Sequence, residues 1–189
     1  QITDFTLSTD SSLWACDKRS LLKLKTILKR EKKDIQIQYI HTFPLEDSER
    51  FMKLCLSENR KALYLVTNHG RIFQFDTNSK KIVNYAQLPI LKAEFGASSM
   101  SYQNGKVWIS SMVYGIFICD PSLQQIDNLV NQPNAKILSH NDVYNITAIS
   151  HDLYLAVTWY GYTTIHTSSK NPKTWTTDIY THMPAWDTQ

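Results

Sequence analysis

The residues best suited to bind a ligand form one short aromatic segment, Trp159-Tyr160-Gly161-Tyr162. Aromatic faces stack on the apolar C–H surfaces of a sugar or a peptide, and indole N–H and phenol O–H groups donate hydrogen bonds. Two other pairs precede a glycine in the same way, Asn68-His69 and Val113-Tyr114. The candidate ligand-binding residues are therefore Trp159, Tyr160, Tyr162, Tyr114, His69 and Asn68. The alternative is that these aromatic side chains seal an interface between structural units.

Catalytic and metal-binding motifs do not accompany this segment. The six histidines are scattered without metal-ligand spacing, and neither an H-E-x-x-H nor a G-x-S-x-G motif occurs. His140 with Asp142 and His151 with Asp152 are the nearest approach to an acid–base pair, and such pairs in turns are usually hydrogen-bonded loop residues. We therefore expect no cofactor, no metal and no enzymatic activity in this segment.

The charge and the cysteines exclude further classes. The formal net charge of +3 is too small to indicate a nucleic-acid partner, and the basic run Lys29-Arg30-Glu31-Lys32-Lys33 is interpreted as a solvated loop between strands. No stretch approaches the roughly 20 apolar residues of a membrane span. Cys16, Cys55 and Cys119 are odd in number and lie in apolar contexts, which predicts buried thiols rather than a disulfide framework.

These candidate residues sit in a repeat that recurs four times. An apolar residue and an aromatic residue open a short alternating strand at Leu13-Trp14, Leu63-Tyr64, Val107-Trp108 and Leu153-Tyr154. A second strand-like run precedes each copy, at residues 2–7, 51–56, 98–102 and 143–149. A polar turn separates the two runs, and Asn104-Gly105 is the strongest hairpin signal among these turns.

A third and a fourth run follow in each unit. The third opens with Gly70, Gly115 or Gly161 in three of the units, where glycine permits a tight turn or a close approach of a neighbouring unit. In the first unit the stretch 21–33 is interpreted as a strand plus a long loop, with a short helix as the alternative. The fourth run is more polar, at residues 35–40, 81–86, 124–130 and 175–180.

A unit of about 45 residues with four short strands is typical of a β-propeller blade. One blade cannot bury both of its faces, so blades stack around an axis. We therefore predict an all-β propeller segment of four four-stranded blades in a single domain, 1–189. The approximate blades are 1–45, 46–90, 91–135 and 136–189. The aromatic residues at 14, 64, 108 and 154 are expected to wedge between adjacent blades.

The last unit resembles the two-component regulator propeller repeat. Leu138-Ser139-His140-Asn141-Asp142-Val143 is similar to that family's opening element, and Leu13-Trp14 and Val107-Trp108 match its Leu-Trp element. Phe75-Asp76 and Cys119-Asp120 match the end of its third strand. The first unit departs from the pattern because it lacks the glycine, and the fourth because its third strand ends in His166.

This resemblance implies a periplasmic sensor region of a membrane-anchored hybrid histidine kinase of the Bacteroidetes type, which detects carbohydrate fragments. Such repeats usually come in sevens, so the resemblance implies that four blades are part of a larger ring. A ring closed by these four blades alone is an alternative. The partners expected on this basis are an oligosaccharide ligand, and either the remaining blades of the parent protein or a second copy that forms a homodimer. The alternative function is a structural or protein-interaction propeller that mediates assembly.

Overall fold

The computed structural model of this chain describes residues 1–8, 10, 12–29, 32–90, 95–133, 137–169 and 172–181. These residues form four separate four-stranded antiparallel sheets and one short 3₁₀ turn, η1 (Pro172–Thr174). The prediction of an all-β chain with four four-stranded blades is confirmed. The described residues include no helix long and apolar enough to span a membrane.

Each sheet is a simple up-and-down meander in chain order. Blade one consists of β1 (Asp4–Leu7), β2 (Ser12–Cys16), β3 (Ser20–Lys29) and β4 (Lys32–Thr42). Blade two consists of β5 (Phe51–Leu56), β6 (Ala62–Thr67), β7 (Arg71–Asp76) and β8 (Lys81–Gln87). Blade three consists of β9 (Ala97–Gln103), β10 (Lys106–Ser111), β11 (Gly115–Cys119) and β12 (Ile126–Leu129). Blade four consists of β13 (Val143–Ala148), β14 (Leu153–Thr158), β15 (Gly161–His166) and β16 (Thr176–Thr181).

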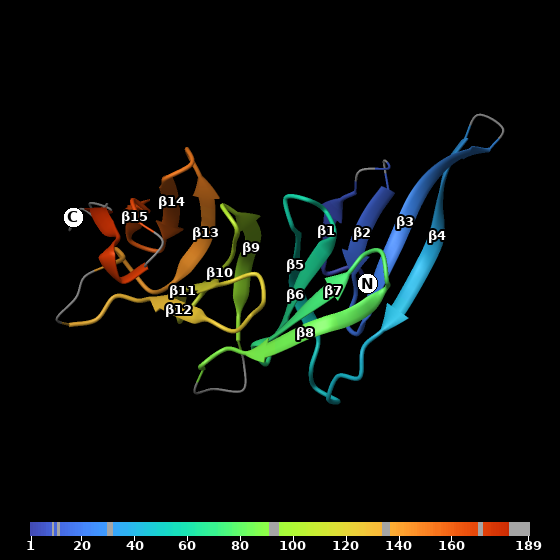
Figure 1. Cartoon of the computed structure of the whole chain (residues 1–189), viewed down its shortest axis with the longest axis horizontal. Helices are drawn as coiled ribbons and strands as arrows, with labels where there is room; N and C mark the ends of the chain where they lie inside the picture. Colours follow the sequence, from blue (N-terminus) through green and yellow to red (C-terminus); the bar gives the residue numbers. More distant parts are fainter. Residues whose placement is uncertain are drawn as a thin grey trace, which may run out of the picture.

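The first strand of each blade is the innermost one. Strand β5 lies between β1 and β9, and β13 lies against β9. Figure 1 shows β1–β4 and β13–β16 at opposite ends of the long axis of the molecule, so the blades form an open arc. This arrangement leaves one sheet face of blade one and one of blade four without a neighbouring blade.

Aromatic side chains fill the spaces between consecutive blades. Trp14 belongs to a buried cluster with Phe75 of blade two, and the ring of Tyr64 stacks on Tyr102 of blade three with centroids 5.6 Å apart. Trp108 stacks on Tyr154 of blade four with centroids 4.2 Å apart. The prediction that the aromatic residues at 14, 64, 108 and 154 lie between neighbouring blades is therefore confirmed.

Tyr154, the fourth of these aromatic residues, differs from the other three because it faces the preceding blade and not the next one. Leu63 pairs with Phe75 and Val107 with Cys119, and in blade four the corresponding pair is Tyr154 with Ile165. Tyr154 therefore takes the place of Leu63 and Val107 and faces back toward blade three. The alignment of Tyr154 with Tyr64 and Trp108 was wrong by one residue, because a slip of one residue in a strand exchanges its two faces.

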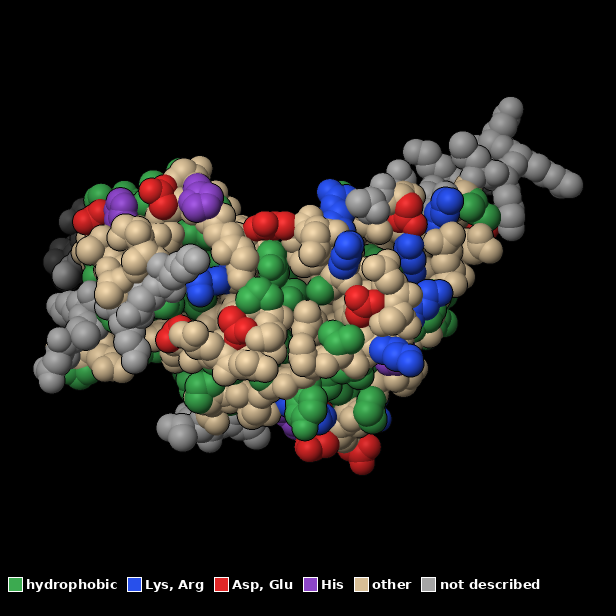
Figure 2. Space-filling model, in the orientation of Figure 1, with side chains coloured by type: hydrophobic (Ala, Val, Ile, Leu, Met, Phe, Trp, Pro, Cys, Tyr) green, Lys and Arg blue, Asp and Glu red, His purple; other side chains and the backbone are tan. Residues whose placement is uncertain are grey.

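A long hairpin replaces the loop that the sequence suggested in blade one. Strands β3 and β4 pair continuously, apart from one bulge, as far as Lys29 opposite Lys32. Lys29 and Lys32 therefore lie at the last described pair of a protruding hairpin, and Arg30 and Glu31 lie outside the described residues. Figure 2 shows Lys and Arg side chains gathered on the right-hand side of the view, where blade one lies in Figure 1.

The three cysteines are buried and unpaired, as predicted. Burial raises the pKa of the Cys16 thiol to about 11 and that of Cys119 to about 12. Burial also raises the pKa of the Cys55 thiol. These thiols are therefore packing residues and poor nucleophiles, because the thiolate is the reactive form.

The glycine that opens the third strand is required by a close backbone approach in blade three. Gly115 has φ +73°, and a Cβ placed on it would lie 2.2 Å from the carbonyl oxygen of Leu129 in β12. Gly115→Ala is expected to lower the free energy of unfolding by about 2–4 kcal/mol, from the left-handed backbone and the overpacking together. Urea unfolding followed by circular dichroism measures this change.

Gly105→Ala is the matched control for this substitution. Gly105 also has a positive φ, +70°, but a Cβ there meets no atom within 4 Å. Only the cost of placing alanine in a left-handed backbone remains, so the free energy of unfolding is expected to fall by about 1 kcal/mol. Equal losses for the two variants would show that the contact with β12 does not constrain position 115.

Candidate functional site

The candidate site lies where the turn between the second and third strands of a blade meets the loop that leads into its first strand. In blade four the Trp159 N–H donates to the Asp142 carbonyl at 3.1 Å. In blade three the Gly115 N–H donates to the Asn141 carbonyl at 2.9 Å. Loop 139–142 therefore joins the turns of both blades. We call the surface formed by loop 139–142 and turns 112–114 and 159–160 the turn face.

Two aromatic side chains of the turn face are accessible. Trp159 is 63% exposed and Tyr160 is 49% exposed. The Trp159 ring lies 6.1 Å from Tyr144, and the Tyr160 ring lies edge-on to His140 at 4.9 Å. Each ring is thus supported on one side by an aromatic neighbour while much of its surface remains open to a ligand.

His140 contributes polar groups to the turn face. Its Nδ1 accepts a hydrogen bond from the Asp142 N–H at 3.0 Å, an arrangement that leaves Nε2 to carry the ring proton in the neutral imidazole. The Asp142 carboxylate lies 3.7 Å from the same Nδ1. The His140–Asp142 pair thus makes a loop hydrogen bond through the main chain, and the His140 ring lies beside Tyr160.

Tyr162 is separated from the turn face. It lies on β15 opposite Val157, and its ring stacks on Tyr180 of β16 with centroids 4.6 Å apart. Tyr162 and Tyr180 share the outer sheet face of blade four. The aromatic segment 159–162 is therefore divided between the turn face and the outer sheet face of blade four.

Tyr114 and the two blade-two residues have different surroundings. The Tyr114 ring is 6.2 Å from Phe95 and partly buried. Asn68 is buried, with its Oδ1 accepting from the Arg50 N–H at 2.7 Å and its Nδ2 donating to the Ser48 carbonyl at 3.2 Å. Asn68 therefore holds loop 46–50 in place.

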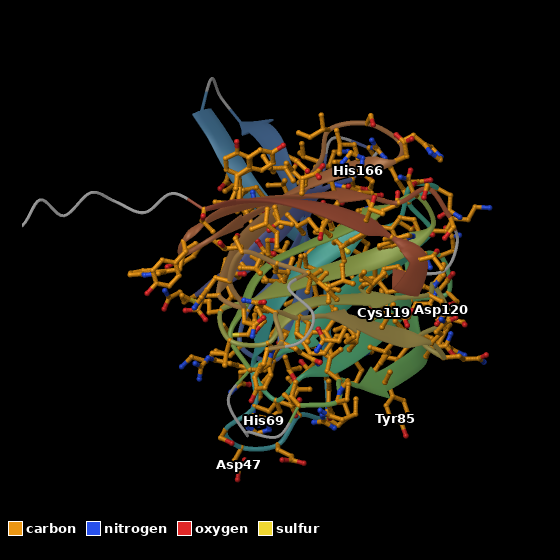
Figure 3. All side chains as sticks on the ribbon, turned by 90° about the vertical axis from the view of Figure 1, so that its left-hand side faces the viewer. Asp47, His69, Tyr85, Cys119, Asp120 and His166 are labelled. Carbon is orange, nitrogen blue, oxygen red and sulfur yellow. The ribbon has the colours of Figure 1, made fainter. Side chains whose placement is uncertain are left out.

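His69 lies against the same loop. Its Nε2 is 3.3 Å from the Ser48 hydroxyl and its Nδ1 is 3.7 Å from the Glu46 carboxylate. Figure 3 shows His69 beside Asp47 at the lower end of the molecule. Ligand binding by the six predicted residues stays a prediction, but the structure brings only Tyr114, Trp159 and Tyr160 to the turn face.

A buried ion pair in blade two escaped the sequence analysis. The Glu49 side chain is fully enclosed, and its carboxylate accepts hydrogen bonds from Arg71 Nε at 2.7 Å, from Arg71 Nη2, and from the Thr67 hydroxyl at 2.6 Å. Burial alone would raise the pKa of Glu49, but the hydrogen bonds from Arg71 and Thr67 outweigh it and lower that pKa. This network fastens the loop before β5 to the turn between β6 and β7.

A hollow of about 610 Å³ lies between blades three and four at the other end of the strands. Its lining includes Asn104, Lys106, His151 and Trp175, and none of the six predicted residues. Trp175 also borders a second hollow, of about 350 Å³, between β12 and β16. Within the part of the chain that the structure describes, no three His, Cys, Asp or Glu side chains are grouped to hold a metal ion.

Comparisons with solved structures agree with the propeller fold. The chain is similar to the WD40 repeats of RRP9 (TM-score 0.61, 12% identity), over 94% of this chain and 51% of that one. It is also similar to an extracellular domain assigned to a hybrid two-component system of B. thetaiotaomicron (TM-score 0.62, 13% identity), over 87% of this chain and 21% of that one. A chain of the mitotic checkpoint complex matches with a TM-score of 0.61 and 11% identity, over 92% of this chain and 50% of that one.

No protein-family model matches the chain, and no curated protein sequence matches it. At these identities the solved structures establish the fold alone. The chain spans about half the length of the WD40 structures and about a fifth of the two-component domain. This chain therefore has propeller blades like those of WD40 proteins and of one two-component extracellular domain.

Proposed function

We propose that this chain is part of an extracytoplasmic, ligand-sensing β-propeller of a two-component regulator, and that its turn face binds carbohydrate fragments. The observation that carries this proposal is the accessible pair Trp159 and Tyr160 beside the polar groups of His140. Flat aromatic surfaces next to a few hydrogen-bonding groups suit sugar rings. The fold likeness to the two-component extracellular domain and the repeat resemblance support the same class.

In this proposal the segment senses rather than catalyses. The periplasmic location and the membrane anchor belong to the proposed parent protein, a hybrid histidine kinase. The turn face holds its ligand by stacking and hydrogen bonding, and the blades transmit occupancy to the rest of the parent protein.

The second candidate function is a protein-interaction propeller. Met112 and Val113 are 47% and 57% exposed on the turn of blade three, next to the loop that carries His140. WD40 repeats of RRP9 and a chain of a mitotic checkpoint assembly share the fold. An apolar rim of this kind suits a peptide or protein partner better than a sugar.

The test is thermal unfolding of the chain against a panel of oligosaccharides, followed by calorimetric titration of any glycan that shifts the transition. A ligand at about 100 times its dissociation constant adds about 2.7 kcal/mol, or roughly 5–10 °C for a domain of this size. Trp159→Ala is expected to weaken the binding of that glycan about tenfold, the equivalent of about 1.4 kcal/mol of lost stacking.

Tyr85→Ala is the matched control. Tyr85 is an aromatic residue 74% exposed on β8, and Figure 3 shows it pointing away from the ribbon. Its removal should leave glycan affinity unchanged. Unchanged affinity in Trp159→Ala would remove the turn face as the site, and the absence of any glycan shift would favour the interaction propeller.

A further inference from the structure

The outer face of blade four repeats a surface that is buried in every other blade. In blades one to three, one cross-strand pair of the second and third strands faces the next blade: Cys16 with Leu21, Val66 with Ile72, and Ser110 with Ile116. All six side chains are 0% exposed. The equivalent pair in blade four is Val157 with Tyr162, and these are 40% and 44% exposed.

The outer face of blade one is likewise exposed where the equivalent surface of other blades is buried against the preceding blade. Phe5 pairs with Ala15, and the equivalent first-strand residues are Leu54 in blade two and Ile146 in blade four. Leu54 and Ile146 are 3% and 4% exposed because they pack against the preceding blade, whereas Phe5 is 63% exposed. The apolar residues that accompany Phe5 on this face are Leu7 (66% exposed), Ile37 (52%) and Ile40 (55%).

The two open surfaces are therefore the unmatched halves of one interface. We define the head face by Phe5, Leu7, Ile37 and Ile40, and the tail face by Val157, Tyr162 and Tyr180. Within the chain, a surface equivalent to the tail face packs on one equivalent to the head face at each of the three blade junctions. Figure 1 places blades one and four at opposite ends, so one chain does not bring its own two faces together.

We propose that a second copy of this chain covers both faces, so that the head of each copy packs on the tail of the other. The repeat supplies the complementarity, because each new junction would reproduce the packing of the internal ones. A head-to-tail contact closes when the rotation it generates completes a ring. Two copies of four blades make eight, which lies within the range of four to eight blades of known propellers.

A head-to-head or tail-to-tail pair lacks this support, because neither contact occurs at any junction between the blades. The inference stands on the two end faces and does not depend on which ligand the turn face binds.

The test measures the mass of the chain in solution by light scattering and sedimentation. We expect a dimer of about twice 21.9 kDa. Phe5→Asp alters the head and Tyr162→Asp the tail, and each variant alone should be monomeric because both junctions then contain a charged face. An equimolar mixture of the two should recover a dimer, because one unaltered head meets one unaltered tail.

Tyr85→Asp, on the outer strand of blade two, is the control and should remain dimeric. Circular dichroism melting shows that each variant is folded, and Leu7→Asp replaces Phe5→Asp if that variant does not fold. A monomeric parent chain at its highest soluble concentration overturns the proposal and assigns the faces to further blades of a longer polypeptide. Failure of the mixture to recover a dimer overturns the head-to-tail arrangement.

Discussion

Trp108→Ala is expected to lower the free energy of unfolding by about 3–5 kcal/mol. Trp108 is 1% exposed and lies between two rings of blade four, with centroids 4.2 Å from Tyr154 and 5.4 Å from Trp175. Its removal leaves a cavity between blades three and four that neighbouring strands cannot fill, because both sheets are held by their own backbone hydrogen bonds. The loss in free energy of unfolding therefore reports how much the Trp108 side chain contributes to the junction between blades three and four.

Trp159→Ala is the control for this measurement, since it removes the same side chain from a position that is 63% exposed. Surface substitutions of that kind usually change stability by about 0.5 kcal/mol or less. Urea unfolding followed by far-ultraviolet circular dichroism avoids the change in tryptophan fluorescence. Similar losses in the two variants would contradict the assignment of Trp108 to the junction.

The fold could be predicted because its strongest signals are local. Asn104-Gly105 was expected to form a hairpin turn, and both residues have positive φ, 51° and 70°, as the tight turn between antiparallel strands requires. The alternating apolar runs predicted the strands of each blade for the same reason, since the period of two is a property of a single strand.

The register of the fourth blade could not be predicted from such local signals. Residues 153–157 are apolar throughout, so either phase of the strand places apolar side chains on both faces. The pairing of Thr158 with Gly161 fixes the phase, and that turn is shorter than the one between Ser111 and Gly115. Only the paired backbone shows that Leu155, rather than Tyr154, takes the place of Trp108.

The candidate site was predictable in part for a related reason. Trp159 and Tyr160 are neighbours in a turn, and large aromatic residues there stand out in the sequence. The contribution of His140 depends on the meeting of a loop and a turn, and the Glu49–Arg71 pair joins segments on either side of β6. Contacts of this kind depend on sheet geometry, which composition and spacing do not specify.

Arg71→Met is the second substitution with a large expected effect, a loss of about 3 kcal/mol in the free energy of unfolding at pH 7. The methionine keeps most of the apolar stem but leaves the enclosed Glu49 carboxylate without its charged partner. Arg50→Met is the control, because Arg50 directly follows Glu49 in the chain and its side chain is exposed. A loss in Arg71→Met no larger than in Arg50→Met would show that Glu49 does not depend on Arg71.

The same pair predicts a dependence on pH. The pKa of Glu49 is lowered in the folded chain, so its ionised form stabilises the fold at neutral pH and above the pKa of an unfolded glutamate, about 4.3. As the pH falls through and below that value, Glu49 becomes protonated in the unfolded chain while it is still ionised in the folded chain. The contribution of Glu49 to the free energy of unfolding is then lost. Unfolding free energies measured at several pH values should therefore fall more steeply for the parent chain than for Glu49→Gln. Because both chains share every other carboxylate, the difference between the two slopes isolates Glu49, and parallel slopes would mean that its pKa is not lowered by folding.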